Sequence, residues 1–264
     1  MMPSMMNGLT GLNTHMKGME VISNDVANVN SVGYKQEEIT FQELLQRLGV
    51  GVSAIIKDFT NGSLMQTDVS SNLAVSGNGF FVVADPAAAA GNVEYTRAGD
   101  FIMEYDPGTG TTYLVNSSGD RLRGVMGGTP DATGLTSADL TDIALPAGTT
   151  AFKIGTDGTI TASVNGNEPQ IIGRVAIATF ENNHALQMQK NGLYTAMAEA
   201  GPQPLANPGS SGVGQIYQGY IEQSNVDLSR EFTEMILSQR GFQANSRSIT
   251  TSDEMLQEVL NLKR

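Results

Sequence analysis

The sequence predicts an α+β protein in which helices at both ends of the chain flank a β-rich centre. Apolar residues recur with helical spacing near each terminus, whereas the centre consists of short apolar runs separated by turn-forming dipeptides. The 30 glycines among 264 residues also indicate many tight turns. With 40% hydrophobic residues, the chain can bury the core of one large domain or of two modest ones.

The first predicted helix lies within residues 1–34 and carries an apolar stripe with heptad-like spacing. Its residues are Met5, Leu9, Leu12, Met16, Met19 and Val26, with Ile22 and Val29 beside them. Such a stripe is typical of a helix that packs along another helix. Gly8, Gly11 and Gly18 each lower intrinsic helix stability by up to about 1 kcal/mol. We therefore expect this helix to be weak alone and to need a partner.

The second predicted helix occupies residues 227–264. One heptad series is unbroken, and it consists of Leu228, Met235, Phe242, Ile249 and Leu256. A second series contains Phe232 and Leu260 but is interrupted by Gln239, Ser246 and Asp253, and such polar positions can fix the register of a seam at a cost in stability. Asp227 is the expected N-cap, and Lys263 and Arg264 suit the negative end of the helix dipole.

These two stripes allow two interpretations. The terminal helices can form one pair, antiparallel or parallel, that covers the core of a domain. Alternatively, they can assemble with the helices of other copies of the chain. The helical spacing alone is compatible with both.

The centre is predicted to form short strands joined by tight turns. The expected strands lie within 51–63, 73–83, 95–105, 112–125, 151–164 and 173–180. Ile154 to Ile160 reads as a hairpin with Asp157-Gly158 at its turn. We divide the chain into an N-terminal helix (1–34), an extended connector (35–72), a β-rich core (73–200), a return linker (201–226) and a C-terminal helix (227–264).

The charge of the chain is concentrated in its centre. The net charge is −12, and residues 36–226 hold eight basic and nineteen acidic residues. An acidic chain has no general footprint for nucleic acid or for anionic membranes, so we expect neither partner. The nearly neutral ends suit packing against copies of the same chain.

The sequence offers little for catalysis or for metal binding. There is no cysteine, and we interpret His15 and His184 as structural residues. Gly77 to Val82 begins like a dinucleotide fingerprint but lacks its last glycine, and Glu37 and Glu38 are adjacent and so face different ways. We expect no catalytic residue, cofactor or metal. No secretory signal and no apolar run of about 18 residues is present, so export would need a route without a cleaved signal.

The stretch NDVANVNSVGYK at 24–35 closes the first helix. Asn24 and Asn28 are four apart, so they share one helix face, and Gly33 allows a turn into an extended connection. The asparagines either satisfy the helix end by themselves or bond a neighbouring subunit. Both interpretations account for the local chemistry.

Three separated motifs resemble the flagellar axial proteins, the bacterial rod and hook family. They are the Asn24-to-Asn28 core followed by Gly33-Tyr34-Lys35, the central LAVSGNGFFVV and YTRAGDFIME, and the last 40 residues. The sequences QRGFQANS (239–246) and LNLKR (260–264) look most like hook proteins, and the short span from Phe41 to Gly51 lacks the extra stretch typical of distal rod subunits. This resemblance favours a short hook protein, with a distal rod protein as the alternative.

The resemblance implies a structural, non-enzymatic subunit whose terminal helices pair as a discontinuous coiled coil inside a tube. It implies a helical homopolymer that joins rod to filament and transmits motor torque. Its implied partners are copies of itself, adjacent rod and hook–filament junction proteins, a hook cap or scaffold protein and the flagellar type III export apparatus. The residues expected to mediate self-assembly are Leu9, Leu12, Met16, Met19, Asn24, Val26, Asn28, Leu228, Phe232, Met235, Phe242, Ile249, Leu256 and Leu260.

Overall fold

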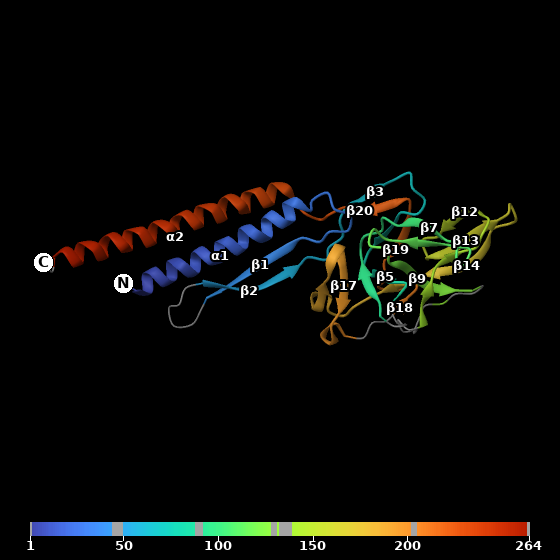
Figure 1. Cartoon of the computed structure of the whole chain (residues 1–264), viewed down its shortest axis with the longest axis horizontal. Helices are drawn as coiled ribbons and strands as arrows, with labels where there is room; N and C mark the ends of the chain where they lie inside the picture. Colours follow the sequence, from blue (N-terminus) through green and yellow to red (C-terminus); the bar gives the residue numbers. More distant parts are fainter. Residues whose placement is uncertain are drawn as a thin grey trace. The chain divides into compact units, whose positions relative to one another are not determined.

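The chain divides into two compact units, each of which combines segments distant in the sequence. A computed structural model describes residues 2–43, 50–87, 92–127, 131, 139–201 and 205–262. The helical unit comprises residues 1–30, 35–60 and 225–264, and the β unit comprises 31–34 and 61–224 (Figure 1). Terminal helices and a β-rich centre confirm the predicted α+β class. The expected C-terminal cations Lys263 and Arg264 lie outside the described residues.

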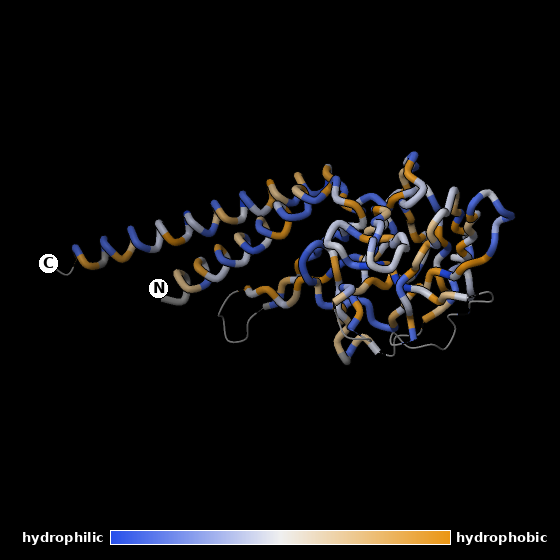
Figure 2. Tube along the Cα trace, turned by 45° about the vertical axis from the view of Figure 1, so that its right-hand side comes forward, coloured by the Kyte–Doolittle hydropathy of each residue, from blue (hydrophilic) through white to orange (hydrophobic). Residues whose placement is uncertain are grey.

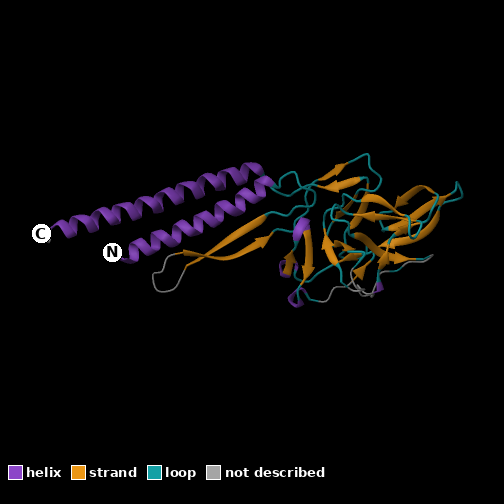
Figure 3. Cartoon of the chain, in the orientation of Figure 1, coloured by secondary structure: helices purple, strands orange, loops and turns teal. Residues whose placement is uncertain are grey.

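The helical unit contains two long antiparallel helices and one hairpin (Figure 3). They are α1 (Met2–Ala27), α2 (Leu228–Leu262), β1 (Glu37–Glu43) and β2 (Val50–Lys57). β1 and β2 pair antiparallel, with Glu37 opposite Lys57, and the Lys57 ammonium lies 2.6 Å from the Glu37 carboxylate. The Thr14 hydroxyl donates to the carbonyl of Val50 at 3.0 Å and so joins the hairpin to α1.

The helix ends follow from local hydrogen bonds. The Asp227 carboxylate accepts the backbone N–H of Ser229 at 2.9 Å and that of Arg230 at 3.4 Å, which confirms the predicted N-cap of α2. After the end of α1, Gly33 has φ +66°. A Cβ at Gly33 would lie 2.6 Å from the backbone nitrogen of Ala98, so glycine is required both for the turn and for the close approach.

Among its described residues, the β unit contains short strands and three single-turn 3₁₀ helices. Its strands are β3 (Leu64–Gln66), β4 (Leu73–Ser76), β5 (Phe80–Ala84), β6 (Glu94–Thr96), β7 (Ile102–Asp106), β8 (Thr111–Val115), β9 (Arg121–Met126), β10 (Thr141–Asp142), β11 (Ala144–Leu145), β12 (Thr149–Ile154), β13 (Thr159–Val164), β14 (Gln170–Val175), β15 (Ile177–Ala178), β16 (Leu186–Met188), β17 (Leu193–Ala196), β18 (Leu205–Ala206), β19 (Gln215–Gln218) and β20 (Tyr220–Glu222). The 3₁₀ helices are Asn183–Ala185, Lys190–Gly192 and Ala198–Ala200.

One large sheet organises the β unit and encloses its core. Its main path runs β12-β13-β14-β9-β5-β6-β17-β16, and β19 pairs with β4 and β20 with β3 in two smaller sheets. The predicted hairpin is confirmed, because β12 and β13 pair with Ile154 opposite Ile160 and Gly158 has φ +77° at the turn. The core consists of Leu73, Val75, Phe81, Val83, Phe101, Leu114, Leu122, Ile143, Leu145, Ile154, Ile160, Val175, Ile177, Leu193 and Ile216.

A buried ion pair lies at one margin of the β unit. The Arg97 guanidinium is 3.4 Å from the Glu222 carboxylate, and it also donates to the carbonyl of Gly77 at 2.9 Å. Glu222 in turn accepts the backbone N–H of Gly62 on its carboxylate and that of Gly33 on its carbonyl. This pair therefore ties together segments around 33, 62, 97 and 222 that are far apart in the sequence.

Candidate assembly surface

The contact between α1 and α2 is built largely from small and polar side chains. On α1, two series of residues seven apart face α2 or lie buried, and they are Gly8, His15 and Ile22, and Gly11, Gly18 and Asp25. On α2, Ser238, Gly241, Asn245 and Ile249 lie opposite them, and Glu231 and Ser252 are buried. The helices thus meet along heptad-spaced positions, and on α1 the spacing belongs mainly to glycines and polar residues.

Glycines allow the two helices to approach closely. A Cβ on Gly241 would lie 2.4 Å from the ring of His15, and one on Gly11 would lie 2.5 Å from the amide nitrogen of Asn245. The predicted role of the helix glycines was only to weaken α1, so their packing role was missed. The seven-residue spacing of Gly11 and Gly18 is the signal that points to it.

The predicted assembly residues lie on several faces of the helices. Those that are exposed are Leu9, Met16, Asn24, Leu228, Phe232 and Leu260. Those that are half-buried are Leu12, Met19, Val26, Asn28, Met235, Phe242, Ile249 and Leu256. Hydrophobic and hydrophilic segments alternate along both helices (Figure 2). Leu9 and Met16 of α1 and Phe232 and Leu260 of α2 are large apolar side chains that are exposed.

The two predicted series of α2 have different environments. Met235, Phe242 and their heptad relatives are half-buried in the helical unit. Phe232 and Leu260, by contrast, are 50% and 67% exposed. The second series therefore does not form the seam with α1, and its apolar members project from the helix pair together with Ile236 and Leu237.

The asparagines at the end of α1 bond each other. The Asn28 amide donates to the side-chain oxygen of Asn24 at 3.0 Å and to its carbonyl at 2.9 Å. This arrangement is the self-satisfied helix end considered from the sequence. A contact of these residues with a neighbouring subunit stays a prediction.

Two buried carboxyl groups, one from each helix, accept hydrogen bonds from the segment at the start of β1. Asp25 of α1 is 0% exposed and accepts the backbone N–H of Glu37, whereas Glu231 of α2 is 1% exposed and accepts the side-chain amide of Gln36 at 2.6 Å. Burial, followed by the negative charges of Asp25 and Glu234, raises the pKa of Glu231 to about 7. The adjacent groove of about 240 Å³ is also lined by Ile22, Ile39 and Leu237, among others.

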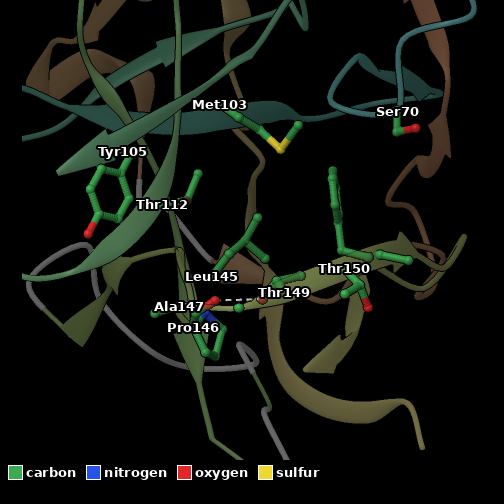
Figure 4. Close-up of a pocket in the computed structure, with 12 residues that line it drawn as sticks. Ser70, Met103, Tyr105, Thr112, Leu145, Pro146, Ala147, Thr149 and Thr150 are labelled. Carbon is green, nitrogen blue, oxygen red and sulfur yellow. Dashed lines mark hydrogen bonds between the residues drawn. The ribbon is translucent and has the colours of Figure 1, made fainter. Parts of the chain in front are cut away.

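The β unit carries a separate surface hollow of about 530 Å³ between strands β7 and β8 and the turn that leads into β12 (Figure 4). Met103, Tyr105 and Leu145 line it, and the Thr149 hydroxyl donates to the carbonyl of Pro146 at 2.7 Å. No lining residue is an acid, a histidine or a lysine.

Within the part of the chain that the structure describes, no group of three or more histidine, aspartate or glutamate side chains is arranged to hold a metal ion. Neither described helix combines the length and the apolar character needed to cross a bilayer.

Comparison with known proteins identifies the class of this chain. Residues 74–162 match the family described as the flagellar hook protein FlgE/F/G D1 domain, and residues 217–262 match the flagellar basal body rod FlgEFG protein C-terminal family. The chain belongs to the flagellar rod and hook protein family, whose members are structural and not enzymes. The resemblance drawn from its three motifs is thereby confirmed.

Within this family, the similar proteins are mostly rod subunits. The flagellar basal-body rod protein FlgG of Bacillus subtilis is 34% identical over 286 residues, covering 100% of both chains. FlgG of Buchnera aphidicola (Acyrthosiphon pisum) is 32% identical and covers 99% of this chain. The flagellar hook protein FlgE of Borreliella burgdorferi is 23% identical over 450 residues, covering 100% of both.

These comparisons correct the order of the two candidate roles. The sequence was interpreted as hook first and distal rod second, on its C-terminal motifs and on a short span after Phe41. Full-length similarity to several proteins named FlgG supports the rod alternative better. Similarity along the whole chain carries more weight than resemblance in a few local motifs.

Proposed function

We propose that this chain is a distal rod subunit of the flagellar basal body that assembles helically with copies of itself and transmits torque. The observation that carries the proposal is the full-length similarity to rod proteins combined with apolar side chains that project from the helix pair. Isolated exposed apolar residues are common on proteins. Here, however, they recur on α1 and α2 at Leu9, Met16, Phe232 and Leu260.

In this proposal the helical unit supplies the contacts between subunits. The projecting stripe of one helix pair packs on helices of neighbouring copies as a coiled coil, and each buried apolar surface contributes about 25 cal/mol per Å². Because the contact joins different surfaces of two copies, it continues as a filament and does not close as a dimer. We keep the fourteen predicted assembly residues in this proposal. Met235, Phe242, Ile249 and Leu256 would act indirectly, by holding α1 and α2 together, and the other ten would contact neighbouring copies.

Truncation tests the assembly mechanism. Removing residues 1–30 or 228–264 is expected to leave a soluble monomer that forms no tubes at concentrations at which the full chain polymerises, as followed by light scattering and electron microscopy. The matched control is the double substitution Lys190→Ala and Lys153→Ala in the β unit, which leaves both helices intact. Tubes formed by either truncated chain would refute the terminal-helix mechanism.

A second candidate role is the hook. It is favoured by one observation, which is that β1 ends at Glu43 and β2 already begins at Val50, so the hairpin has little room for an added stretch. A deletion strain distinguishes the two roles. A truncated rod supports the distal rod proposal, whereas a complete rod without a hook supports the hook.

The proposal also includes the partners and the route of the subunit. We place neighbouring axial proteins at the two ends of its segment, with a cap or scaffold protein at the growing end and the hook–filament junction beyond the hook. Export through the flagellar type III apparatus would need no cleaved signal. Secretion of the full chain by a wild-type strain, but not by a strain lacking export, tests this route.

A further inference from the structure

Asparagine is followed directly by glycine at five places in the chain, and such a pair can react without an enzyme. The backbone nitrogen of the glycine attacks the side-chain amide carbon of the asparagine, and the missing glycine side chain leaves the approach open. The fold decides which pairs react, because the backbone between the two residues must rotate before the attack. The pairs begin at Asn7, Asn61, Asn78, Asn165 and Asn191.

The pair Asn61-Gly62 is held at both of its reacting groups. The side-chain oxygen of Asn61 accepts a hydrogen bond from the Arg97 guanidinium at 3.3 Å. The Gly62 N–H donates to the buried Glu222 carboxylate at 2.9 Å. Both bonds involve a charged group, and hydrogen bonds of this kind are the stronger ones. Rotation of the backbone at this pair is therefore costly.

Two more pairs are fixed by their surroundings. Asn7 and Gly8 lie inside α1, where the helical backbone prevents the rotation. Gly79, which follows Asn78, is buried, and a Cβ added there would clash with the side chain of Ile177. Neither pair can turn its glycine nitrogen toward the asparagine side chain without local unfolding.

The pair Asn165-Gly166 lies in an exposed turn between β13 and β14. Asn165 and Gly166 have φ of +51° and +76°. The Val164 carbonyl accepts the Asn167 N–H at 3.0 Å, which defines a type I′ turn, and the Ser163 hydroxyl donates to the Asn167 carbonyl at 2.6 Å. A Cβ added at Gly166 would meet no atom within 4 Å. Among the described residues, no hydrogen bond engages the Asn165 side-chain amide or the Gly166 N–H.

The pair Asn191-Gly192 has nearly the same backbone but a restrained side chain. Asn191 and Gly192 have φ of +59° and +72°, and a Cβ added at Gly192 also meets no atom within 4 Å. The Asn191 side-chain amide, however, donates to the Ser118 hydroxyl at 3.0 Å. This pair therefore isolates the contribution of one side-chain hydrogen bond.

We propose that Asn165 is a site of spontaneous deamidation in the folded chain, with water as the only co-reactant. The Gly166 nitrogen forms a bond to the Asn165 amide carbon, the side-chain carbon–nitrogen bond breaks, and ammonia leaves with the proton of the Gly166 N–H. One water molecule then opens the resulting succinimide ring, giving its hydroxyl group to one carbonyl carbon and its other hydrogen to the nitrogen. No atom is oxidised or reduced.

The modification changes the charge and the length of the turn. Both ring-opened products carry a carboxylate, so each event adds one negative charge to the acidic β unit, three residues before Glu168. Attack of water on the former backbone carbonyl of Asn165 gives isoaspartate, which lengthens the backbone by one carbon and is expected to disrupt the Val164–Asn167 turn bond. This reaction lies in the β unit and does not depend on the proposed rod function.

The test compares the pairs within one sample. The full chain is incubated in mildly alkaline water enriched in a heavy oxygen isotope and is sampled by peptide mass spectrometry. We expect Asn165 to convert first, with heavy oxygen in its new carboxylate, and at least about tenfold faster than Asn61, whose two hydrogen bonds to charged groups must break. In urea the two pairs are expected to react at similar rates. Conversion of Asn61 as fast as Asn165 in the folded chain overturns the proposal.

Two substitutions test the chemistry and the role of the fold. Asn165→Gln is expected to abolish conversion at this position, because its longer side chain would have to close a larger ring. Ser118→Ala frees the Asn191 amide and is expected to raise the rate at Asn191 several-fold while the rate at Asn165 stays unchanged. Faster conversion of Asn191 than of Asn165 in the unmodified chain contradicts the proposal.

Discussion

The helical unit and the β unit stabilise themselves in different ways. The β unit buries a continuous apolar core whose members Leu73, Phe81 and Leu114 are fully shielded from water. In the helical unit, α1 and α2 contact each other through glycines and polar side chains. Large apolar residues such as Phe232 and Leu260 are exposed to solvent. The β unit therefore has the core of an independent domain, whereas in our proposal the helical unit is completed by neighbouring copies.

The two units also differ in charge and in their spectroscopic reporters. Residues 31–34 and 61–224 hold six basic and fifteen acidic residues, so most of the net charge of −12 belongs to the β unit. All seven tyrosines lie in the β unit and tryptophan is absent, whereas the two long helices belong to the helical unit. Tyrosine fluorescence and circular dichroism at 222 nm can thus follow the two units separately.

The largest expected loss of stability comes from a substitution beside the core of the β unit. A Cβ on Gly99 would lie 1.6 Å from the carbonyl oxygen of Leu73, so Gly99→Ala requires backbone movement at the edge of the core. We expect a loss of about 4 kcal/mol or more in the free energy of unfolding, measured by tyrosine fluorescence in urea.

The matched control is Gly110→Ala, where a Cβ meets no atom within 4 Å but φ is +68°. Its cost is expected to be only about 1 kcal/mol, from backbone strain. Equal effects of the two substitutions would show that the close approach at Gly99 contributes nothing.

The β unit and the helical unit are also expected to differ in how much an ion pair contributes to their stability. Arg97→Met leaves the buried Glu222 carboxylate without its cation, and we expect tyrosine fluorescence to show a loss of about 3–5 kcal/mol. Glu20→Gln breaks the Lys17–Glu20 pair of α1, whose side chains are exposed, and is expected to cost about 0–1 kcal/mol by circular dichroism. A small effect at Arg97 would mean that the segments around residues 33, 62 and 222 are held by other contacts.

The difference between the units also explains how much of the fold follows from the sequence. Alternating strands and turns such as Asp157-Gly158 are local signals, so the β12–β13 hairpin was predictable. The pairing order of the strands was not, because it depends on contacts among residues distant in the chain. Neither was the Arg97–Glu222 pair, whose members are 125 residues apart and carry no local signature.

At the candidate assembly surface, the sequence indicated both terminal helices correctly but not the face of the helix that each apolar series occupies. The apolar residues of α1 suggested a seam, yet Gly8 and Gly11 are the α1 positions at which an added Cβ would lie closest to α2. Hydrophobic spacing alone cannot separate a contact within the chain from one between copies, since both bury apolar side chains. Small residues at seven-residue spacing were the signal for the inner contact.

Two glycines of the helical unit are expected to respond in opposite directions. At Gly241 a Cβ would lie 2.4 Å from the His15 ring, so Gly241→Ala should reduce the stability of the helix pair by about 1–2 kcal/mol after the gain in helix propensity. At Gly18 the nearest atom, the Ser238 hydroxyl, is 3.6 Å away, so Gly18→Ala should raise stability by up to about 1 kcal/mol. Thermal circular dichroism of the full chain measures both, and a gain at Gly241 would contradict the close-packed geometry.

The smallest effect on a single chain is expected at the projecting series. Phe232→Ser removes an apolar side chain that is half exposed. The free energy of unfolding of the monomer's helix pair should therefore change by less than about 0.5 kcal/mol. Met235→Ser, three residues along the same helix, removes a half-buried apolar side chain and should cost more than 1 kcal/mol in the free energy of unfolding.

In polymerisation, Phe232→Ser is expected to have a large effect although it has the smallest effect on the stability of the single chain. Phe232→Ser is expected to raise the concentration needed for tube formation several-fold although its monomer is intact, because the lost surface is buried only between copies. Sedimentation of the polymer over a concentration series measures this threshold, with Thr233→Ser as a neighbouring control. If Phe232→Ser leaves the threshold unchanged, the projecting stripe is ordinary solvent-exposed surface, and the helical unit resembles the β unit in being complete by itself.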